Sequence, residues 1–338
     1  MSDYKVPFAV LAGVNRGKYK EQERSDKDRS GKLYRTDFLD GDDKLFRVLD
    51  NGKSILENTL NAVYPLASKP PLIISGDIMR LKWCLPHHYP KLNVEQQKGQ
   101  SLTDNVYQAI NSMHRVGENS GFVLIGGDLP SISTEDLESF IEQSYKEDKD
   151  VVMGLANIDE MRDVYSRVKS KTTKRPKKFG IRIKDNKEMY ETPNPKLNFG
   201  TIFFIRNTLY EKKDNLRDRL DDIISLKRVF NDSHNYPVLA NFLKDDDKEV
   251  AWEPKSKLSL AYFALTNSTP LRKLLLGNFL CGASVNYAMN ITELEEVIEN
   301  KIFNYELSLG IVRVSPMFGY DIDDENDLSI ANSIKSKK

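Results

Sequence analysis

The chain has 338 residues, of which 39% are hydrophobic and 30% charged, so it can bury a sizeable core beneath a heavily charged surface. Its 50 basic residues equal its 50 acidic ones, which excludes a global field that would attract nucleic acid or an anionic membrane. Cys84 and Cys281 give neither a disulfide framework nor a zinc-binding spacing, and no apolar run is long enough for a signal peptide or a membrane span. We therefore expect a soluble, cytoplasmic protein.

The first predicted element is a buried strand over residues 8–13, which feeds a loop containing Arg16, Gly17 and Lys18. Gly13 and Gly17 leave backbone N–H groups free to face an anion, and the two basic side chains supply positive charge. The loop is not a Walker loop, because no Gly-Lys-Ser/Thr tripeptide closes it. The pattern favours a phosphate cradle, with a solvated surface loop as the alternative.

Residues 18–44 are dense in charge and have almost nothing to bury, so we expect a partly ordered loop. Residues 50–53 contain an Asn-Gly turn signal. Ser54 then begins a predicted helix over residues 55–64, and Glu57 completes a capping box.

A second short buried strand is predicted over residues 72–76. Residues 94–99 then lead into a polar segment and a helix that runs to Met113. Strands and helices alternate in this way from residue 8 to residue 145, which predicts an α/β fold with a doubly wound, mostly parallel sheet.

The most informative stretch is the apolar run 122–125, which ends at Gly126 and Gly127 and is followed at once by Asp128. Pro130 prevents the strand from continuing. This predicts a buried parallel strand that delivers a carboxylate at its carboxyl end, where ligands gather in open α/β sheets. The glycines would allow a ligand or a metal to approach the backbone.

A simpler interpretation places Asp128 in an ordinary turn between a strand and a helix. Ser133 would cap that helix, with Asp136 as a shorter substitute for the usual glutamate or glutamine of the capping box. The local pattern favours neither interpretation, so the rest of the chain has to decide.

Later strands are predicted over residues 151–154, 201–205 and 311–314, the second of them preceded by Asn198-Phe199-Gly200. The basic residues between 167 and 187 are typical of a solvated loop, and a lid or a patch for an acidic substrate is the alternative.

Residues 209–310 are mainly helical in pattern, and the acidic cluster at 321–327 leads into a final helix. We expect a core at 1–208, a helical appendage inserted at 209–310, and a last strand and helix at 311–338 that return to the core.

Four short motifs occur in one order along the chain: Leu11-Ala12-Gly13, Gly52-Lys53-Ser54, Gly127-Asp128-Leu129-Pro130 and Asp321-Ile322-Asp323. In these motifs the chain resembles the nucleotidyltransferases of the glycosyltransferase-A type fold, most closely the molybdenum-cofactor guanylyltransferase-like group. The resemblance covers roughly residues 6–206 and 311–334. It departs from the family where Gly13 is followed by Val14 instead of a second glycine, and where the last motif lacks its Thr-Pro.

The resemblance implies transfer of a nucleoside monophosphate from a nucleoside triphosphate to a phosphorylated small-molecule acceptor, with release of pyrophosphate. Asp128 would hold magnesium, or manganese, with Asp323 as the second ligand. Arg16 and Lys18 would meet the β- and γ-phosphates, and Lys44 the α-phosphate. The nucleotide pocket would be lined by residues at the ends of the first strands and in the following loops, namely Leu11, Ala12, Gly13, Gly17, Gly99, Ser101 and Gly127.

Two rival functions stay open at this point. One is a glycosyltransferase on the same fold, which would use a finished nucleotide-sugar and manganese; the basic loop after the first strand speaks against it. The other is a catalytically inactive nucleotide-binding protein, which the degenerate motifs favour. The sequence leaves the acceptor, the base and a homo-oligomeric state undecided.

Overall fold

The computed structural model describes residues 5–12, 41–76, 78–85, 92–99, 102–115, 121–168, 181–184, 189, 195–211, 259, 262–263, 266–270, 272–273, 289–301, 303, 306–322 and 325–335. The statements below concern these residues. Among them, no helix combines the length and the apolar character that crossing a membrane requires.

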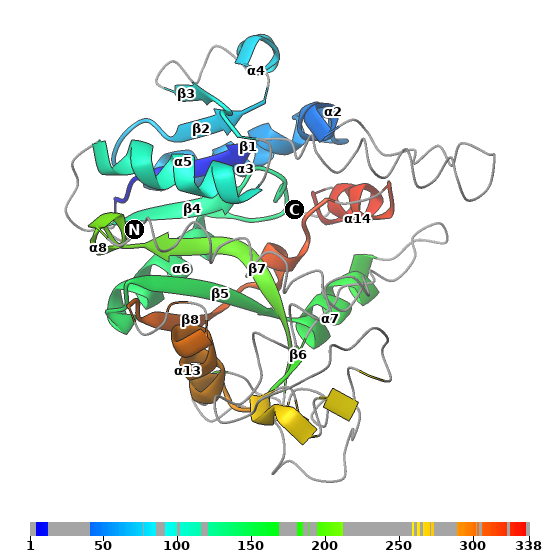
Figure 1. The fold of residues 1–338 in the computed structure, drawn as a ribbon. Helices are drawn as coiled ribbons and strands as arrows, with labels where there is room; N and C mark the ends of the chain where they lie inside the picture. Colours follow the sequence, from blue (N-terminus) through cyan, green and yellow to red (C-terminus); the bar gives the residue numbers. More distant parts are fainter. Residues whose placement is uncertain are drawn as a thin grey trace.

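One eight-stranded sheet forms the centre of the fold, with the strand order β3-β2-β1-β4-β7-β5-β8 and with β6 paired to β7 (Figure 1). Its strands are β1 (Phe8–Ala12), β2 (Leu72–Ser75), β3 (Asn93–Gln96), β4 (Phe122–Gly126), β5 (Val151–Asn157), β6 (Ile181–Arg182), β7 (Lys196–Ile205) and β8 (Leu309–Val314). β7 runs antiparallel to β4, β5 and β6, whereas the other described pairs are parallel. The prediction of a mostly parallel α/β sheet is therefore confirmed.

Helices cover both faces of this sheet, because successive strand residues point to opposite sides. On β1, for example, Val10 and Ala12 join one apolar cluster and Ala9 joins the other. The first cluster receives side chains from α2 (Gly41–Phe46), α3 (Ile55–Val63), α4 (Ile78–Cys84), α6 (Thr134–Glu147), α7 (Ile158–Val168) and α14 (Glu325–Lys335). The second receives them from α5 (Leu102–Arg115), α8 (Thr208–Glu211) and α13 (Ile291–Lys301).

The predicted capping boxes are present at α3 and α6. The Ser54 N–H donates to Glu57 Oε2 at 2.6 Å while the Glu57 N–H donates to Ser54 Oγ at 3.1 Å, and Ser133 and Asp136 repeat the exchange at 2.9 and 3.2 Å. Each box satisfies N–H groups that a helix start leaves unpaired. The turn before α3 also forms as predicted, with Gly52 at a φ of 77°, a conformation that glycine adopts without strain.

Helix α13 begins with a capping box that the sequence analysis missed, in which Asn290 and Glu293 exchange hydrogen bonds at 2.8 and 3.0 Å. Burial raises the pKa of Glu293, but hydrogen bonds from the Lys273 ammonium and the Asn290 N–H outweigh burial, so that its pKa is lowered. The helical pattern predicted over residues 209–310 includes this helix, but the start signal at Asn290 was not recognised.

Two expectations about local structure need correction. Residues 41–44, expected to end a loop, begin the short helix α2, because Leu45 is buried in the first apolar cluster and anchors this turn. Asn198-Phe199-Gly200 lies inside β7 instead of before it. β7 begins earlier, at Lys196, because β5 is longer than predicted and its last residues, Leu155 to Asn157, pair with residues 197–199.

Most of residues 209–310 lie outside the described part of the chain, so the domain boundaries stay a prediction. Helix α13, which belongs to this stretch, packs directly on the sheet: its Ile291 and Leu294 are buried together with Ile311 of β8.

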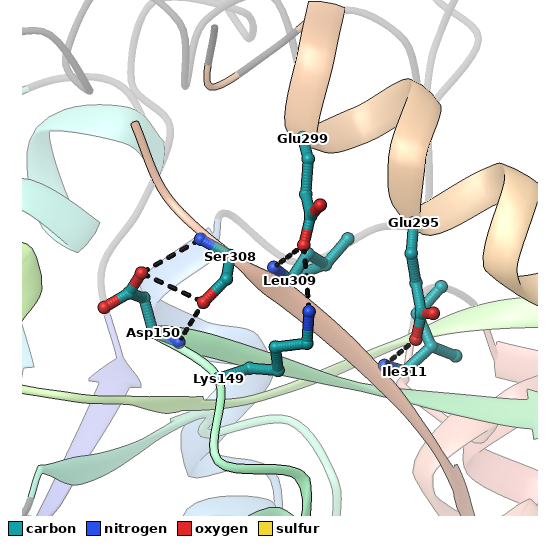
Figure 2. A network of polar contacts seen from close by, with 7 residues as sticks. All are labelled: Lys149, Asp150, Glu295, Glu299, Ser308, Leu309 and Ile311. Carbon is teal, nitrogen blue, oxygen red and sulfur yellow. Dashed lines mark hydrogen bonds and ion pairs between the residues drawn. The ribbon is translucent and has the colours of Figure 1, made fainter. Parts of the chain in front are cut away.

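The outer edge of β8 is covered by side chains instead of another described strand (Figure 2). Glu299 of α13 accepts a hydrogen bond from the Leu309 N–H at 2.7 Å, and Glu295, one turn earlier, accepts one from the Ile311 N–H at 2.8 Å. On the opposite face, Gln143 of α6 donates to the Arg313 carbonyl at 3.1 Å. An edge strand with free N–H groups can pair with another chain, so these contacts protect the edge of the sheet from such pairing.

Glu295→Met is expected to destabilise the fold by about 1–3 kcal/mol, because it leaves the buried Ile311 N–H without this acceptor. It should also cause self-association that grows with protein concentration. Urea unfolding and sedimentation velocity measure the two effects. Glu295→Gln, which keeps an acceptor oxygen, is the control, and equal behaviour of the two variants would refute the edge-covering role.

Candidate active site

The candidate site lies where β1 and β4 end side by side. The two strands are parallel, with Leu11 opposite Gly126, so their carboxyl ends meet at one edge of the sheet. Ligands bind at this edge in open α/β sheets. Asp128 follows β4 directly after Gly127, which places its carboxylate at the predicted edge.

The backbone of Gly127 and Asp128 is held by segments that are far apart in sequence. The Gly127 N–H donates to the Leu11 carbonyl of β1 at 2.9 Å, and the Ile322 N–H donates to the Asp128 carbonyl at 3.2 Å. The fully buried Thr59 of α3 donates its hydroxyl to the Gly127 carbonyl at 3.1 Å. These hydrogen bonds fix the direction in which the Asp128 side chain leaves the chain.

Gly127 lies at a tightly packed position. A Cβ atom there would lie 3.1 Å from Leu56 Cδ1 and 3.2 Å from the Leu11 carbonyl oxygen, and the residue is buried. The space beside Gly127, which was expected to admit a ligand, is thus occupied in part by α3 and β1. Its place in the nucleotide pocket stays a prediction.

Lys44 and Asp128, both predicted site residues, form an ion pair. The Lys44 ammonium, in the last turn of α2, lies 2.8 Å from Asp128 Oδ2 although 84 positions separate the two residues. The side chains are 17% and 23% exposed, respectively. Because the pair is partly buried, salt screens its attraction less than it screens that of a surface pair.

The C-terminal acidic motif reaches the same place. Ile322, which contacts the Asp128 carbonyl, stands between Asp321 and Asp323. Helix α14 holds this segment there, because Glu325 forms an ion pair with Arg47 and Asn332 accepts a hydrogen bond from the Asp50 N–H at 3.0 Å. That Asp128 and Asp323 share a metal stays a prediction, because Asp323 lies outside the described residues.

The other predicted site residues divide into described and undescribed ones. Leu11 and Ala12 end β1 beside Gly127, and Gly99 lies against Asp104, whose Cβ would be 2.0 Å from a Cβ at position 99. Several fall outside the described residues, namely Gly13, Arg16, Gly17, Lys18, Ser101 and Asp323.

Asn105, in the first turns of α5, is a candidate that the sequence analysis did not select. Its side chain is 3% exposed, and within the described part of the chain its Oδ1 has no hydrogen-bond partner. A buried acceptor without a partner is costly, so the atom calls for a donor from a ligand or a water molecule. The available signal was its position: Asn105 shares the buried face of α5 with Ala109, Ser112 and Met113, where an apolar residue is expected.

The residues around Asp128 fit a cation. Its carboxylate already holds the Lys44 ammonium, and carboxylate oxygens are ligands that magnesium prefers. A group of three or more potential ligands does not occur among the described residues, but Asp323 is not one of these. Among the described residues, Asp128 is therefore the candidate ligand, and the C-terminal acidic motif lies beside it.

The chain is a mixed α/β protein with a mostly parallel sheet, consistent with the nucleotide-diphospho-sugar transferase fold. Among solved structures, a hypothetical transferase from Thermus thermophilus is similar, with a TM-score of 0.57 and 16% sequence identity. The match covers 96% of this chain and 99% of the chain of that transferase. At this identity the match shows a shared fold and no more.

Weaker matches include 4-diphosphocytidyl-2C-methyl-D-erythritol synthase from Anaerococcus prevotii, with a TM-score of 0.46, 11% identity and coverage of 99% of this chain and 100% of that one. CMP:2-keto-3-deoxy-manno-octonic acid synthetase complexed with CTP has a TM-score of 0.41, 13% identity and coverage of 67% and 85%. No protein-family model matches the chain, and no curated protein matches it either.

Thr59→Val is expected to leave the protein folded but to weaken binding of Mn²⁺ about tenfold, because the loss of a supporting hydrogen bond lets the Gly127–Asp128 backbone shift. Electron paramagnetic resonance of free Mn²⁺ measures this. Thr59→Ser keeps the hydroxyl and should bind as the wild type does. Ser144→Ala is the matched control, since the buried Ser144 hydroxyl donates to Phe140 of its own helix. Equal affinities in the valine and serine variants would show that Thr59 only packs.

Proposed function

We propose that this chain is a magnesium-dependent nucleotidyltransferase, which transfers a nucleoside monophosphate from a triphosphate to a phosphorylated small-molecule acceptor and releases pyrophosphate. One observation carries the proposal: the predicted phosphate-binding lysine and the predicted metal-binding aspartate meet at 2.8 Å at the carboxyl ends of β1 and β4. The order of motifs and the shared transferase-type fold support it.

In this reaction a phosphate oxygen of the acceptor forms a bond to the α-phosphorus, and the bond from that phosphorus to the bridging oxygen of pyrophosphate breaks. The negative charge that builds on these oxygens needs fixed positive groups instead of covalent help. Lys44 would stabilise the α-phosphate, and Arg16 and Lys18 would hold the β- and γ-phosphates. Asp128 and Asp323 would hold magnesium, which when bound neutralises phosphate charge.

The base would lie beside the end of β1 and the start of α5. Leu11, Ala12, Gly13, Gly99 and Ser101 would line this pocket, with backbone groups that can read the edges of a ring. The unpaired Asn105 Oδ1 supports this placement, because it can accept a hydrogen bond from an amino group or a ring N–H of a base. Buried polar groups of this kind discriminate strongly between ligands.

A melting-temperature panel tests the proposal, since a ligand that binds the native state alone must raise the melting temperature. The panel contains each nucleoside triphosphate and common nucleotide-sugars, with Mg²⁺ or Mn²⁺. We expect a rise with one or more triphosphates that is larger with metal. A rise with nucleotide-sugars alone would indicate a glycosyltransferase. A rise of the same size with and without metal would indicate an inactive nucleotide-binding protein.

Specificity like that of the molybdenum-cofactor guanylyltransferases, a homo-oligomeric state and a cytoplasmic location are further parts of this proposal. The panel addresses the first of these, because that specificity requires GTP to give the largest rise. Sedimentation velocity and microscopy of the tagged chain address the other two.

A further inference from the structure

The ion pair between Lys44 and Asp128 joins a fixed group to a movable one. Asp128 stands on a backbone that β1, α3 and the C-terminal segment all hold by hydrogen bonds. The Lys44 ammonium lies at the end of a long side chain, which extends from the six-residue helix α2. Lysine carries considerable rotamer freedom, so its ammonium can leave the carboxylate while Asp128 stays in place.

The ammonium bonds one of the two carboxylate oxygens of Asp128 that a metal could use. Lys44 Nζ donates a hydrogen bond to Oδ2 at 2.8 Å, and both side chains are mostly buried. A divalent ion that binds this carboxylate either competes with the ammonium for Oδ2 or binds the other oxygen close to a like charge. Both effects weaken binding of the metal alone.

We propose that Lys44 is an internal counter-cation, which keeps Asp128 from binding a divalent metal until a triphosphate draws the ammonium away. The part played by the triphosphate rests on the proposed function, whereas the competition between Lys44 and metal does not. A triphosphate carries more negative charge than a single carboxylate and so attracts the ammonium more strongly. Nucleotide binding then frees Asp128, and the chain takes up metal together with or after the nucleotide.

This coupling has a consequence that a simple phosphate contact would not have. By linkage, a group that must be displaced before metal binds lowers the affinity for metal, and its removal raises that affinity. Removing a residue that only contacts phosphate would leave the affinity for metal alone unchanged. The nucleotide-free protein therefore separates the two roles of Lys44.

The experiment measures Mn²⁺ binding to the nucleotide-free full chain by electron paramagnetic resonance of free Mn²⁺. Lys44→Met is expected to bind Mn²⁺ roughly fivefold more tightly than the wild type, which is the upper end of the effect of one ion pair near the surface. Lys44→Arg keeps the positive charge and should stay near the wild-type affinity. Lys53→Met removes an equal charge from the exposed turn before α3 and is the matched control, with no change expected.

Asp128→Asn in the Lys44→Met background should abolish the tighter binding. If Lys44→Met binds Mn²⁺ no more tightly than the wild type, the counter-cation role is wrong while the proposed function stands. If tight Mn²⁺ binding persists in the double variant, Asp128 is not the metal ligand, and both proposals fail. Should Lys44→Met not fold, Lys44→Gln gives the same comparison, because it also removes the charge and keeps a polar end.

Discussion

Asp128→Asn is expected to lower metal-dependent pyrophosphate release by about a thousandfold, the scale of losing a group that stabilises charge in the transition state. Asparagine has nearly the same shape as aspartate but carries no charge, so its carbonyl oxygen holds a metal cation or the Lys44 ammonium far more weakly. A continuous pyrophosphate assay measures the rate. Melting temperatures recorded beside it show whether the variant is folded.

Glu142→Gln is the matched control, because it removes an equal charge from an exposed i,i+4 ion pair with Lys146 on α6. Its rate should equal that of the wild type. An Asp128→Asn variant that keeps a rate within a factor of about ten would mean that Asp128 is an ordinary turn residue, as the simpler interpretation of the sequence has it.

Asp150→Ala is expected to lower the free energy of unfolding by about 3 kcal/mol, since hydrogen bonds to a charged group are worth about 1.5–3 kcal/mol each and are only partly replaced by water. Asp150 Oδ2 accepts from the Ser308 N–H at 2.9 Å and from the Ser308 hydroxyl at 3.0 Å, while Oδ1 accepts from the Thr208 hydroxyl at 2.6 Å (Figure 2 shows the contacts to Ser308). These contacts join the starts of β5, β8 and α8.

Chemical denaturation measures this loss. The neighbouring Asp148→Asn is the control, because Asp148 is 90% exposed and its ion pair with Arg206 should contribute less than about 1 kcal/mol. Asp150 lies at the amino ends of β5 and β8, opposite the candidate site, so ligand-induced melting shifts should persist in Asp150→Ala. A loss of stability no greater than that of Asp148→Asn would contradict the role assigned to Asp150.

Features that depend on neighbouring residues were predictable from the sequence. The capping boxes at Ser54 and Ser133 follow from pairs of residues three positions apart. The buried strand β4 follows from the continuous apolar run before Asp128. The parallel sheet was predictable for the same reason, because strands and helices alternate along the chain.

Contacts across long sequence separations were not predictable from local pattern. Nothing near Thr59 indicates that its hydroxyl supports Gly127, 68 positions away, and nothing in β8 indicates that glutamates of α13 cover its edge. The antiparallel insertion of β7 between β4 and β5 is likewise a tertiary arrangement. Lys44 was selected only through a family resemblance, and its pairing with Asp128 came from the structure.

Pyrophosphate release by the wild-type chain is the most direct test of the proposed function. The protein is incubated with each nucleoside triphosphate and Mg²⁺, with and without a pool of phosphorylated small molecules, and Asp128→Asn serves as the blank. We expect release that requires Mg²⁺, one preferred triphosphate and an acceptor from the pool, and we expect none from Asp128→Asn. Release that is absent with every triphosphate, or equal in wild type and Asp128→Asn, would contradict the proposed function.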